Sequence, residues 1–165
     1  MNSQTERLID IVRKLRSPDG CPWDREQTHY SILSCFLDEL YEFFETVEQN
    51  DYEHMKEELG DLLLQIVLHT QMASEQKKFD FNDVARDISD KLIRRHPHVF
   101  GSVEVSSTNE VISNWENIKK SEKGKEHRKY IVDDIPEALP ALFRAEKVQR
   151  RVARVGFDWN DSSAA

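Results

Sequence analysis

Four carboxylates in two short acidic motifs are the side chains whose types and spacing point most directly to chemistry. Glu39 and Glu42 stand three residues apart in the first motif. Glu58 and Asp61 repeat that spacing in the second. Residues three apart on an α-helix share a face, so each motif is predicted to present a carboxylate pair. Because close carboxylates repel one another unless a cation neutralises them, the spacing predicts a cation site.

Two long amphipathic helices are predicted to position these pairs. Helical periodicity runs from about residue 30 to 48 and again from 52 to 74, with a stop and restart at Asn50 and Asp51. So short a connection makes the two helices antiparallel neighbours. On a wheel of about 100° per residue, both pairs fall at nearly the same offset from the apolar stripe of their helix. All four carboxylates are then expected on one flank, although two unrelated solvated acidic faces would give the same spacing.

Magnesium is the cation that this ligand set favours, because Mg²⁺ takes hard oxygen ligands and keeps water and substrate phosphates in its shell. The four residues include no histidine or thiol, so Zn²⁺ is a poorer match, and Mn²⁺ is the expected substitute. Metal ions held here would clamp phosphates and lower the pKa of a water molecule. Glu39 lies nearest the apolar edge and is the first choice for the proton acceptor, with Glu42 as the second predicted catalytic residue.

The remaining sequence also has helical rather than strand periodicity, which predicts an all-α protein. Further helices are expected over residues 5–15, 80–96, 109–122 and 136–155. Proline and glycine predict loops over 17–24 and 97–108. A polar segment at 119–129 is expected to be mobile, and 160–165 is expected to be a frayed end.

The run from Leu62 to Leu68 is apolar on every side of its predicted helix, apart from Gln65. A helix that is apolar all round is buried on all sides. A small helical domain cannot easily cover such a helix alone, so an oligomer is expected. A homodimer is the simplest closed form.

Composition excludes several classes of protein. The net charge of −8 lacks the basic footprint of a protein that binds a nucleic acid polymer. Cys21 and Cys35 form neither a metal-type pair nor a disulfide framework. The N-terminus is charged throughout, unlike a secretory signal, and no apolar run approaches the ~20 residues that span a bilayer. A cytoplasmic protein with no membrane partner is expected.

Three other patterns do not favour a second site. His96-Pro97-His98 stands at a predicted helix end, which favours a structural loop over a metal site. Glu26 and His29 form half of a di-iron E-x-x-H pattern, and the sequence has no second half to pair with it. A Walker loop and a G-x-G-x-x-G motif are both missing from the sequence, so a glycine-rich phosphate cradle is not expected.

Motifs along nearly the whole chain resemble the MazG family of all-α nucleotide pyrophosphohydrolases. The family motif E-E-x-x-E, followed one helix later by E-x-x-D, appears here with Asp38 in the first position. Asp38 faces away from the apolar stripe, so this change is expected to have little effect. The other matching segments are GCPWD at 20–24, ELGDLL at 58–63, FDF at 79–81, RRHPHVF at 94–100, WxxxK at 115–119, DDIP at 133–136, LPAL at 139–142 and VGFDW at 155–159.

The resemblance implies an antiparallel helical bundle of the all-α NTP pyrophosphatase type that dimerises through its helices. It implies Mg²⁺-dependent cleavage of nucleoside triphosphates between the α and β phosphates, giving nucleoside monophosphate and pyrophosphate in a housecleaning or regulatory role. The implied metal ligands are Glu39, Glu42, Glu58 and Asp61. The positions matching nucleotide contacts of related domains are Lys91, Arg95, Trp115 and Lys119.

The residues alone leave the roles of these last positions open. Lys91 and Arg95, one helical turn apart, equally suit an ordinary basic helix face, and Trp115 suits a core position better than a stacking one. Fuller members of the family carry two domains in tandem. The chain resembles the first, predicted over 1–125, and a connecting segment, predicted over 126–165.

Two alternatives to an enzyme follow from this organisation. One is a catalytically weak half of a two-domain protein that binds nucleotide and supports dimerisation. The other is a regulatory protein that binds partners through exposed helices. Retention of all four carboxylates favours the enzyme, because an inactive copy has no need of them.

Overall fold

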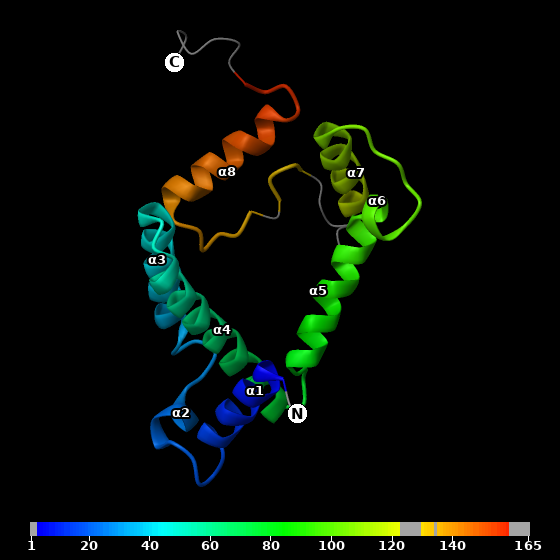
Figure 1. Ribbon diagram of the computed structural model, residues 1–165. Helices are drawn as coiled ribbons and strands as arrows, with labels where there is room; N and C mark the ends of the chain where they lie inside the picture. Colours follow the sequence, from blue (N-terminus) through cyan, green and yellow to red (C-terminus); the bar gives the residue numbers. More distant parts are fainter. Residues whose placement is uncertain (1–2, 123–129, 134, 159–165) are drawn as a thin grey trace. The chain divides into compact units, whose positions relative to one another are not determined.

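The computed structural model describes residues 3–122, 130–133 and 135–158, and every regular element within these ranges is an α-helix. The prediction of an all-α protein is therefore confirmed (Figure 1). The helices are α1 (Gln4–Leu15), α2 (Pro22–Glu26), α3 (Leu33–Gln49), α4 (Tyr52–Glu75), α5 (Phe81–Arg95), α6 (Pro97–Phe100), α7 (Thr108–Ser121) and α8 (Ala141–Ala153).

The chain forms two compact units, Met1–Arg94 and Arg95–Ala165. The first contains α1 to α4 and nearly all of α5, and the second contains α6 to α8. The predicted boundary at residue 125, most of the predicted mobile segment and the predicted frayed end lie outside the described residues. They remain predictions.

Two segments predicted as loops each contain a short helix, and both begin at a proline. Pro22 starts α2 and Pro97 starts α6, each in the first helical position. A proline there has its backbone angle already set for a helix, and the N–H that it lacks has no intrahelical partner anyway. Pro97 thus follows the end of α5 as predicted, and both prolines also begin a new turn, which the sequence pattern did not predict.

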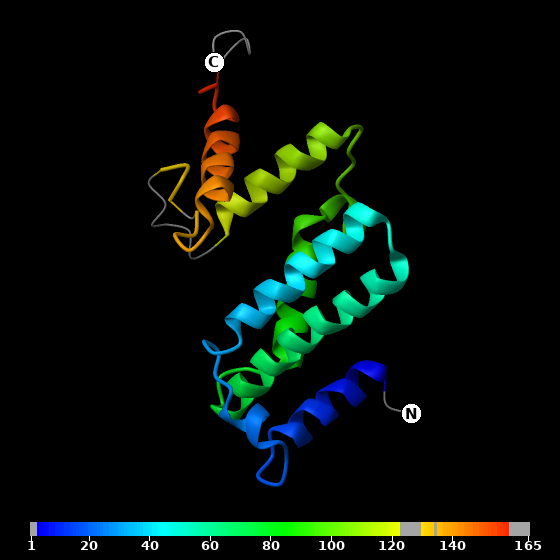
Figure 2. The same cartoon turned by 90° about the vertical axis from the view of Figure 1, so that its left-hand side faces the viewer.

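The antiparallel pair of α3 and α4 is the frame of the first unit (Figure 2). Asn50 ends α3 in the left-handed conformation with φ of 56°, which asparagine tolerates better than most residues. Asp51 then caps α4, and its carboxylate accepts hydrogen bonds at 3.2 Å from the backbone N–H groups of Glu53 and His54. The chain therefore reverses within two residues, as predicted.

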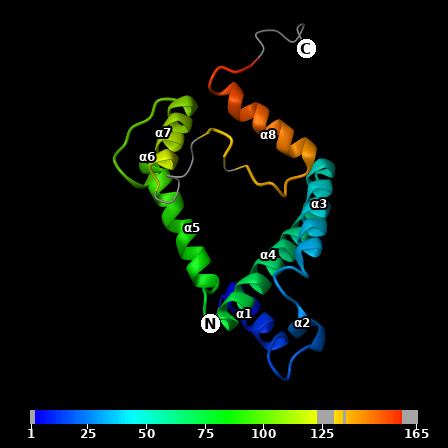
Figure 3. The same ribbon diagram turned by 180° about the vertical axis from the view of Figure 1, so that it is seen from behind.

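A small apolar core joins α1 to α4. It consists of Val12, Ile32, Val67, Leu68 and Met72. The views from the front and from behind both show α1 alongside the C-terminal part of α4 (Figures 1 and 3). The apolar run in the middle of α4 is thus partly covered by its own chain, while Ile66 stays 38% exposed.

Arg16 fixes the connection between α1 and α3. Its side chain is only 7% exposed, and its guanidinium donates two hydrogen bonds of 2.8 Å to the Glu75 carboxylate at the end of α4. The same guanidinium donates to the backbone carbonyl of Asp24 and, at 3.2 Å, to that of Gln27. One side chain therefore holds the segment around α2 against α4.

A pair of histidines makes a second contact between this connection and α4. The Nδ1 atoms of His29 and His69 are 2.8 Å apart, and the rings stack with centroids 5.1 Å apart. One ring must donate a hydrogen bond and the other must accept it, so the contact fails when both rings are protonated. The pKa of His69 is lowered, first by burial and then by the charge of His29.

Replacing His69 by Gln is expected to flatten the acid side of the stability profile. The folded pKa of His69 lies below its ordinary 6.5, so the unfolded chain binds more protons between the two values. The stability that His69 contributes is present above 6.5 and is lost as the pH falls towards the folded pKa. Thermal unfolding midpoints measured between about pH 8 and pH 5 should fall less for His69→Gln than for the wild type.

His54 is the matched control, because its shift has the opposite sign. A side-chain hydrogen bond with Asp51 raises the pKa of His54, so its pairing stabilises the fold at low pH and is lost as the pH rises. His54→Gln should therefore steepen the acid loss. Identical profiles for His69→Gln and the wild type would contradict the assignment to the histidine pair.

Candidate active site

Three of the four predicted carboxylates meet where α3 faces α4. Glu39 comes from α3, and Glu58 and Asp61 come from α4. One carboxylate oxygen from each lies within 4.8 Å of the other two, and all three side chains are half-buried. The helical spacing and the tight reversal at Asn50 together produce this arrangement, because they bring the two faces together at the same level of the pair.

Glu42, the fourth predicted carboxylate, lies at the rim of this group. It is exposed and does not belong to the close triple. Its charge nevertheless acts on both Glu39 and Glu58, and it is the largest single charge effect on Glu58. The structure thus places Glu42 near the site and on its solvent side.

Burial and mutual repulsion raise the pKa values of two members of the cluster. Burial is the largest cause of the raised pKa of Glu39, followed by the charges of Asp61, Glu42, Glu58 and Asp38. Burial is also the largest cause for Glu58, followed by Glu42, Asp61 and Glu57, while His54 acts in the opposite direction. Both carboxylates therefore hold a proton more readily than an isolated glutamate, as groups that await a cation should.

The donor set fits a hard divalent cation. Glu58 Oε2 is buried and has no hydrogen-bond partner within the described residues, so it is an oxygen whose lost hydration nothing replaces. Two oxygens bound to one Mg²⁺ lie at most about 4.2 Å apart. The cluster, at 4.8 Å or less, needs only a small side-chain movement to close around such an ion.

A second buried oxygen without a partner lies on the same helix. It is Oε1 of Gln65, a residue that is only 6% exposed. In the sequence, Gln65 stands out only as an interruption of the apolar run. Its place four residues after Asp61, on the face that carries the carboxylates, was the signal that could have singled it out.

Arg95 and Trp115 lie close together in the second unit. Arg95 also forms an ion pair with Glu122 that the sequence did not predict. The guanidinium of Arg95 donates to the Glu122 carboxylate at 2.9 and 2.6 Å and lies 5.4 Å from the centre of the Trp115 ring. His96 packs edge-on against Trp115, with centroids 5.0 Å apart. Burial is nearly complete at the pair, because the Arg95 and Glu122 side chains are 14% and 13% exposed.

The other two predicted nucleotide contacts are placed separately. Lys91 is exposed on α5 in the first unit, and Lys119 is half-buried on α7 in the second. Glu122 and His96 were not predicted as partners of Arg95 and Trp115. A glutamate 27 residues away gives no periodic signal, because its contact with Arg95 depends on how α7 packs.

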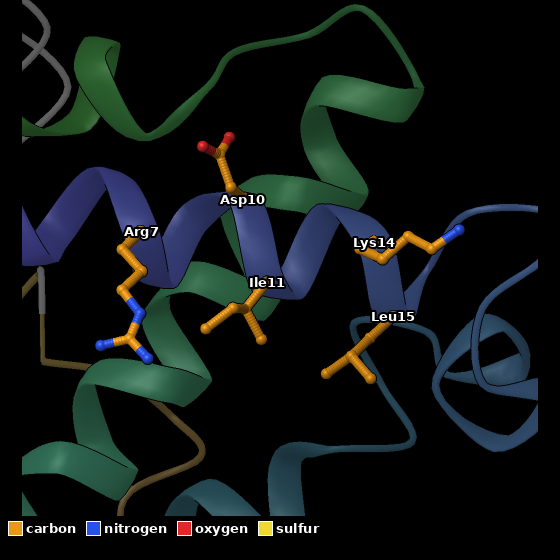
Figure 4. A pocket seen from close by; sticks show the side chains of 5 residues that line it. All are labelled: Arg7, Asp10, Ile11, Lys14 and Leu15. Atoms are coloured by element: carbon orange, nitrogen blue, oxygen red, sulfur yellow. The ribbon is translucent and has the colours of Figure 1, made fainter. Parts of the chain in front are cut away.

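A hollow on the outer face of α1 shows no comparable chemistry (Figure 4). It is lined by Arg7, Asp10, Ile11, Lys14 and Leu15, all from one helix. The figure shows the Asp10 carboxylate pointing away from Ile11 and Leu15. Its polar groups do not converge, so the carboxylate cluster remains the candidate site.

In the described part of the chain, no helix combines the length and the apolar character needed to cross a membrane. A pair of antiparallel helices that gathers carboxylates on its facing sides is a recurrent way to build a cation site in an all-α protein. The fold and the site together thus define a helical-bundle protein with a candidate divalent-cation centre.

Comparison with known proteins gives the family. Residues 27–100 match the model of the MazG nucleotide pyrophosphohydrolase domain, and this segment contains all four predicted carboxylates. The chain is 48% identical over 158 residues to a nucleoside triphosphate pyrophosphohydrolase of Escherichia coli K12. It is 47% identical over 156 residues to a nucleoside triphosphate pyrophosphohydrolase/pyrophosphatase MazG of Thermotoga maritima. The chain belongs to the MazG family.

The alignments cover nearly all of this chain but only part of each relative. They include 95% and 94% of this chain, but only 60% of the E. coli protein and 59% of the T. maritima protein. The chain thus spans about three fifths of the length of these relatives. The crystal structure of a mazG-related protein from T. maritima matches 70% of this chain and 98% of its own, with a TM-score of 0.59 and 29% identity.

Glu58→Gln is expected to weaken Mg²⁺ binding about tenfold or more, because even an outer partner of a metal ligand contributes that much. The substitution keeps the shape of the side chain and removes one charge from the cluster. Since burial and then the neighbouring negative charges raise the pKa of Glu58, the metal-free variant should unfold at the same or a higher temperature. Isothermal calorimetry with Mg²⁺ measures the affinity, and thermal unfolding measures the stability.

Glu57→Gln is the control, because it also removes one negative charge, from the residue of α4 that precedes Glu58 and has an exposed side chain. It should bind Mg²⁺ nearly as the wild type does. Equal affinities for Glu58→Gln and the wild type would move the cation site elsewhere.

Proposed function

We propose that this chain hydrolyses nucleoside triphosphates to nucleoside monophosphate and pyrophosphate with Mg²⁺ as cofactor, Mn²⁺ being the substitute. The observation that carries the proposal is the convergence of Glu39, Glu58 and Asp61 inside the segment that matches the MazG domain. The names of the E. coli and T. maritima relatives support the same activity. Removal of unwanted or regulatory nucleotides in the cytoplasm is the proposed role.

The four carboxylates have different proposed roles in the reaction. Glu39, Glu58 and Asp61 would hold the cation, and Glu42 would complete the shell from the solvent side. When bound, Mg²⁺ supplies charge neutralisation for the phosphates and activates the attacking water. Glu39 is the proposed proton acceptor, because burial and its neighbours raise its pKa and bring it nearer to the working pH of a base.

The proposed contacts to nucleotide are Lys91, Arg95, Trp115 and Lys119. Within this set, Trp115 offers a ring on which a base can stack. Arg95 is bound to Glu122 on one side and lies over Trp115 on the other. A phosphate contact by Arg95 thus requires Glu122 to release it, whereas a role in orienting Trp115 does not.

A second candidate function is supported by the coverage of the relatives. Because the chain spans about 60% of the E. coli protein, it also suits a nucleotide-binding and dimerising half whose catalysis is weak. The intact carboxylate cluster favours the enzyme, since a purely structural half gains nothing from buried charges that repel one another.

The presence of turnover and the identity of its products distinguish these functions. Nucleoside monophosphate and pyrophosphate are the expected products, because a cation held by the carboxylates would neutralise the charge of the leaving pyrophosphate. Glu42→Gln is expected to lower kcat by about 100-fold or more, the scale on which a lost charge-stabilising group acts. Chromatography of each NTP and dNTP after incubation with Mg²⁺ identifies the products.

Glu45→Gln serves as the control for Glu42→Gln, because Glu45 is exposed on the same helix and is not among the charges that act on Glu39 or Glu58. It should retain nearly full turnover. Nucleoside diphosphate and orthophosphate as the first products would overturn the proposed mechanism. Nucleotide binding without turnover would favour the non-catalytic half.

A homodimer is the proposed assembly, formed through the helices. Large apolar side chains remain exposed on both helices that carry the carboxylates. Those on α3 and α4 are Leu33, Leu37, Tyr41, Phe44, Val47, Tyr52, Leu59 and Ile66. A soluble monomer rarely exposes so many apolar groups together, and a self-complementary contact between two copies would cover them.

Light scattering on the full chain tests the assembly. A mass of at least twice the 19.4 kDa of one chain is expected. Phe44→Glu, which places a charge on the exposed apolar face of α3, should lower that mass. Phe100→Glu is the control, because Phe100 is also an exposed phenylalanine but lies on α6. A wild-type mass of one chain at micromolar concentration would contradict the dimer.

A further inference from the structure

Only two buried side-chain oxygen or nitrogen atoms in the described part of the chain have no hydrogen-bond partner, and both belong to α4. They are Oε2 of Glu58 and Oε1 of Gln65. Glu58 is already a member of the carboxylate cluster. Gln65 is 6% exposed and has no part in the site described so far.

The position of Gln65 on α4 links it to the carboxylates. It follows Asp61 by four residues and Glu58 by seven, so the three side chains lie in one row along the helix. Leu68 and Met72 continue this row into the apolar core. Gln65 therefore stands at the border between the cation cluster and the core.

An apolar residue would be expected at this border if packing alone decided it. Burying an acceptor that has no partner costs free energy that a methionine or leucine of similar volume avoids. The other buried polar side chain described on α4, Thr70, follows the usual rule and donates to the Val67 carbonyl at 3.0 Å. The unpaired oxygen of Gln65 thus needs a partner that the described residues do not supply.

We infer that Gln65 is a further positioning residue of the cation site, whose Oε1 accepts a hydrogen bond from a water molecule that the cation holds. The inference rests on the proposed function in one respect, since it takes the cluster to bind a divalent cation. Four residues, about 6 Å at 1.5 Å per residue, separate Gln65 from Asp61 along the helix axis. A contact through water lets Gln65 act on the ion from one helical turn beyond Asp61, without itself joining the ligand set.

The chemistry of the amide explains why this position is not another glutamate. The charges of Asp61, Glu42 and Glu58 already act against Glu39, so a further carboxylate would add to that repulsion. A glutamine presents an acceptor oxygen without a charge. It orients a water molecule and leaves the balance between the cation and the carboxylates unchanged.

Gln65→Met tests the inference with readouts that do not depend on turnover. Methionine fills a similar volume without the polar atoms, so the metal-free variant should unfold at a higher temperature than the wild type. Its affinity for Mg²⁺, measured by calorimetry, should fall about tenfold, as for the loss of other outer partners of a metal. Higher stability with unchanged affinity would overturn the inference and make Gln65 a packing defect.

Gln71→Met is the matched control. Gln71 lies on the same helix, is half-buried and donates to Glu75 at 3.1 Å, so its partner is within the chain. Its replacement should leave Mg²⁺ affinity unchanged. An equal loss of Mg²⁺ affinity in both variants would overturn the specific role of Gln65.

Gln65→Glu keeps the test decisive if methionine disturbs the fold. This variant retains an acceptor oxygen, so it should still bind Mg²⁺ while its metal-free form becomes less stable than the wild type. Loss of Mg²⁺ binding in Gln65→Glu would count against an oxygen role. Failure of this inference can be distinguished from failure of the proposed reaction. A wild type that binds Mg²⁺ without turnover would overturn the proposed reaction and leave the role of Gln65 standing. A wild type that binds neither Mg²⁺ nor Mn²⁺ would overturn both.

Discussion

Repulsion between carboxylates held on facing helices is the constraint on which the first unit depends. Glu39 on α3 meets Glu58 and Asp61 on α4 at 4.8 Å or less, in a half-buried position where water screens poorly. Left alone, this contact would push apart the two helices that create it. The rest of the unit must therefore hold α3 and α4 in place until a cation removes the repulsion.

Two kinds of contact provide that support, and neither lies within the cluster. The reversal at Asn50 and Asp51 ties the helices at one end. Near the other end, Arg16 bridges Glu75 of α4 and the carbonyls that precede α3. The buried apolar core of the unit is small, so these polar contacts add to the positioning of the two helices. The exposed apolar faces of α3 and α4 offer a third support, which a second copy of the chain would supply.

The parts of this site that depend on local geometry were predictable from the sequence, and the parts that depend on packing were not. Helical period and a two-residue connection are local properties, and they bring the carboxylates of the two acidic motifs to the same level of the helix pair. Arg95 was predicted as a nucleotide contact, but its ion pair with Glu122 depends on the packing of α7, which the sequence pattern does not encode. The histidine pair and the unpaired oxygen of Gln65 share this origin, because tertiary packing decides both. The short helices at Pro22 and Pro97 were missed for a different reason, since proline both ends and begins helices.

Protons and cations would compete for the same carboxylate oxygens. The pH should therefore affect the affinity for a cation and the stability of the metal-free chain in opposite directions. The pKa values of Glu39 and Glu58 are raised, so a proton can partly relieve the repulsion when no cation is bound. Bound cation must displace that proton, which makes the apparent affinity for the cation fall as the pH falls. The metal-free chain moves the opposite way, because a raised carboxylate pKa makes the folded state more favourable as the pH drops. In the proposed enzyme, a single cluster would therefore couple three properties: stability without metal, affinity for metal and the supply of a carboxylate that accepts a proton during hydrolysis. A change that reduces the repulsion, such as an amide in place of Glu58, should increase the stability without metal. It should also weaken metal binding and lower the basicity of the remaining carboxylates.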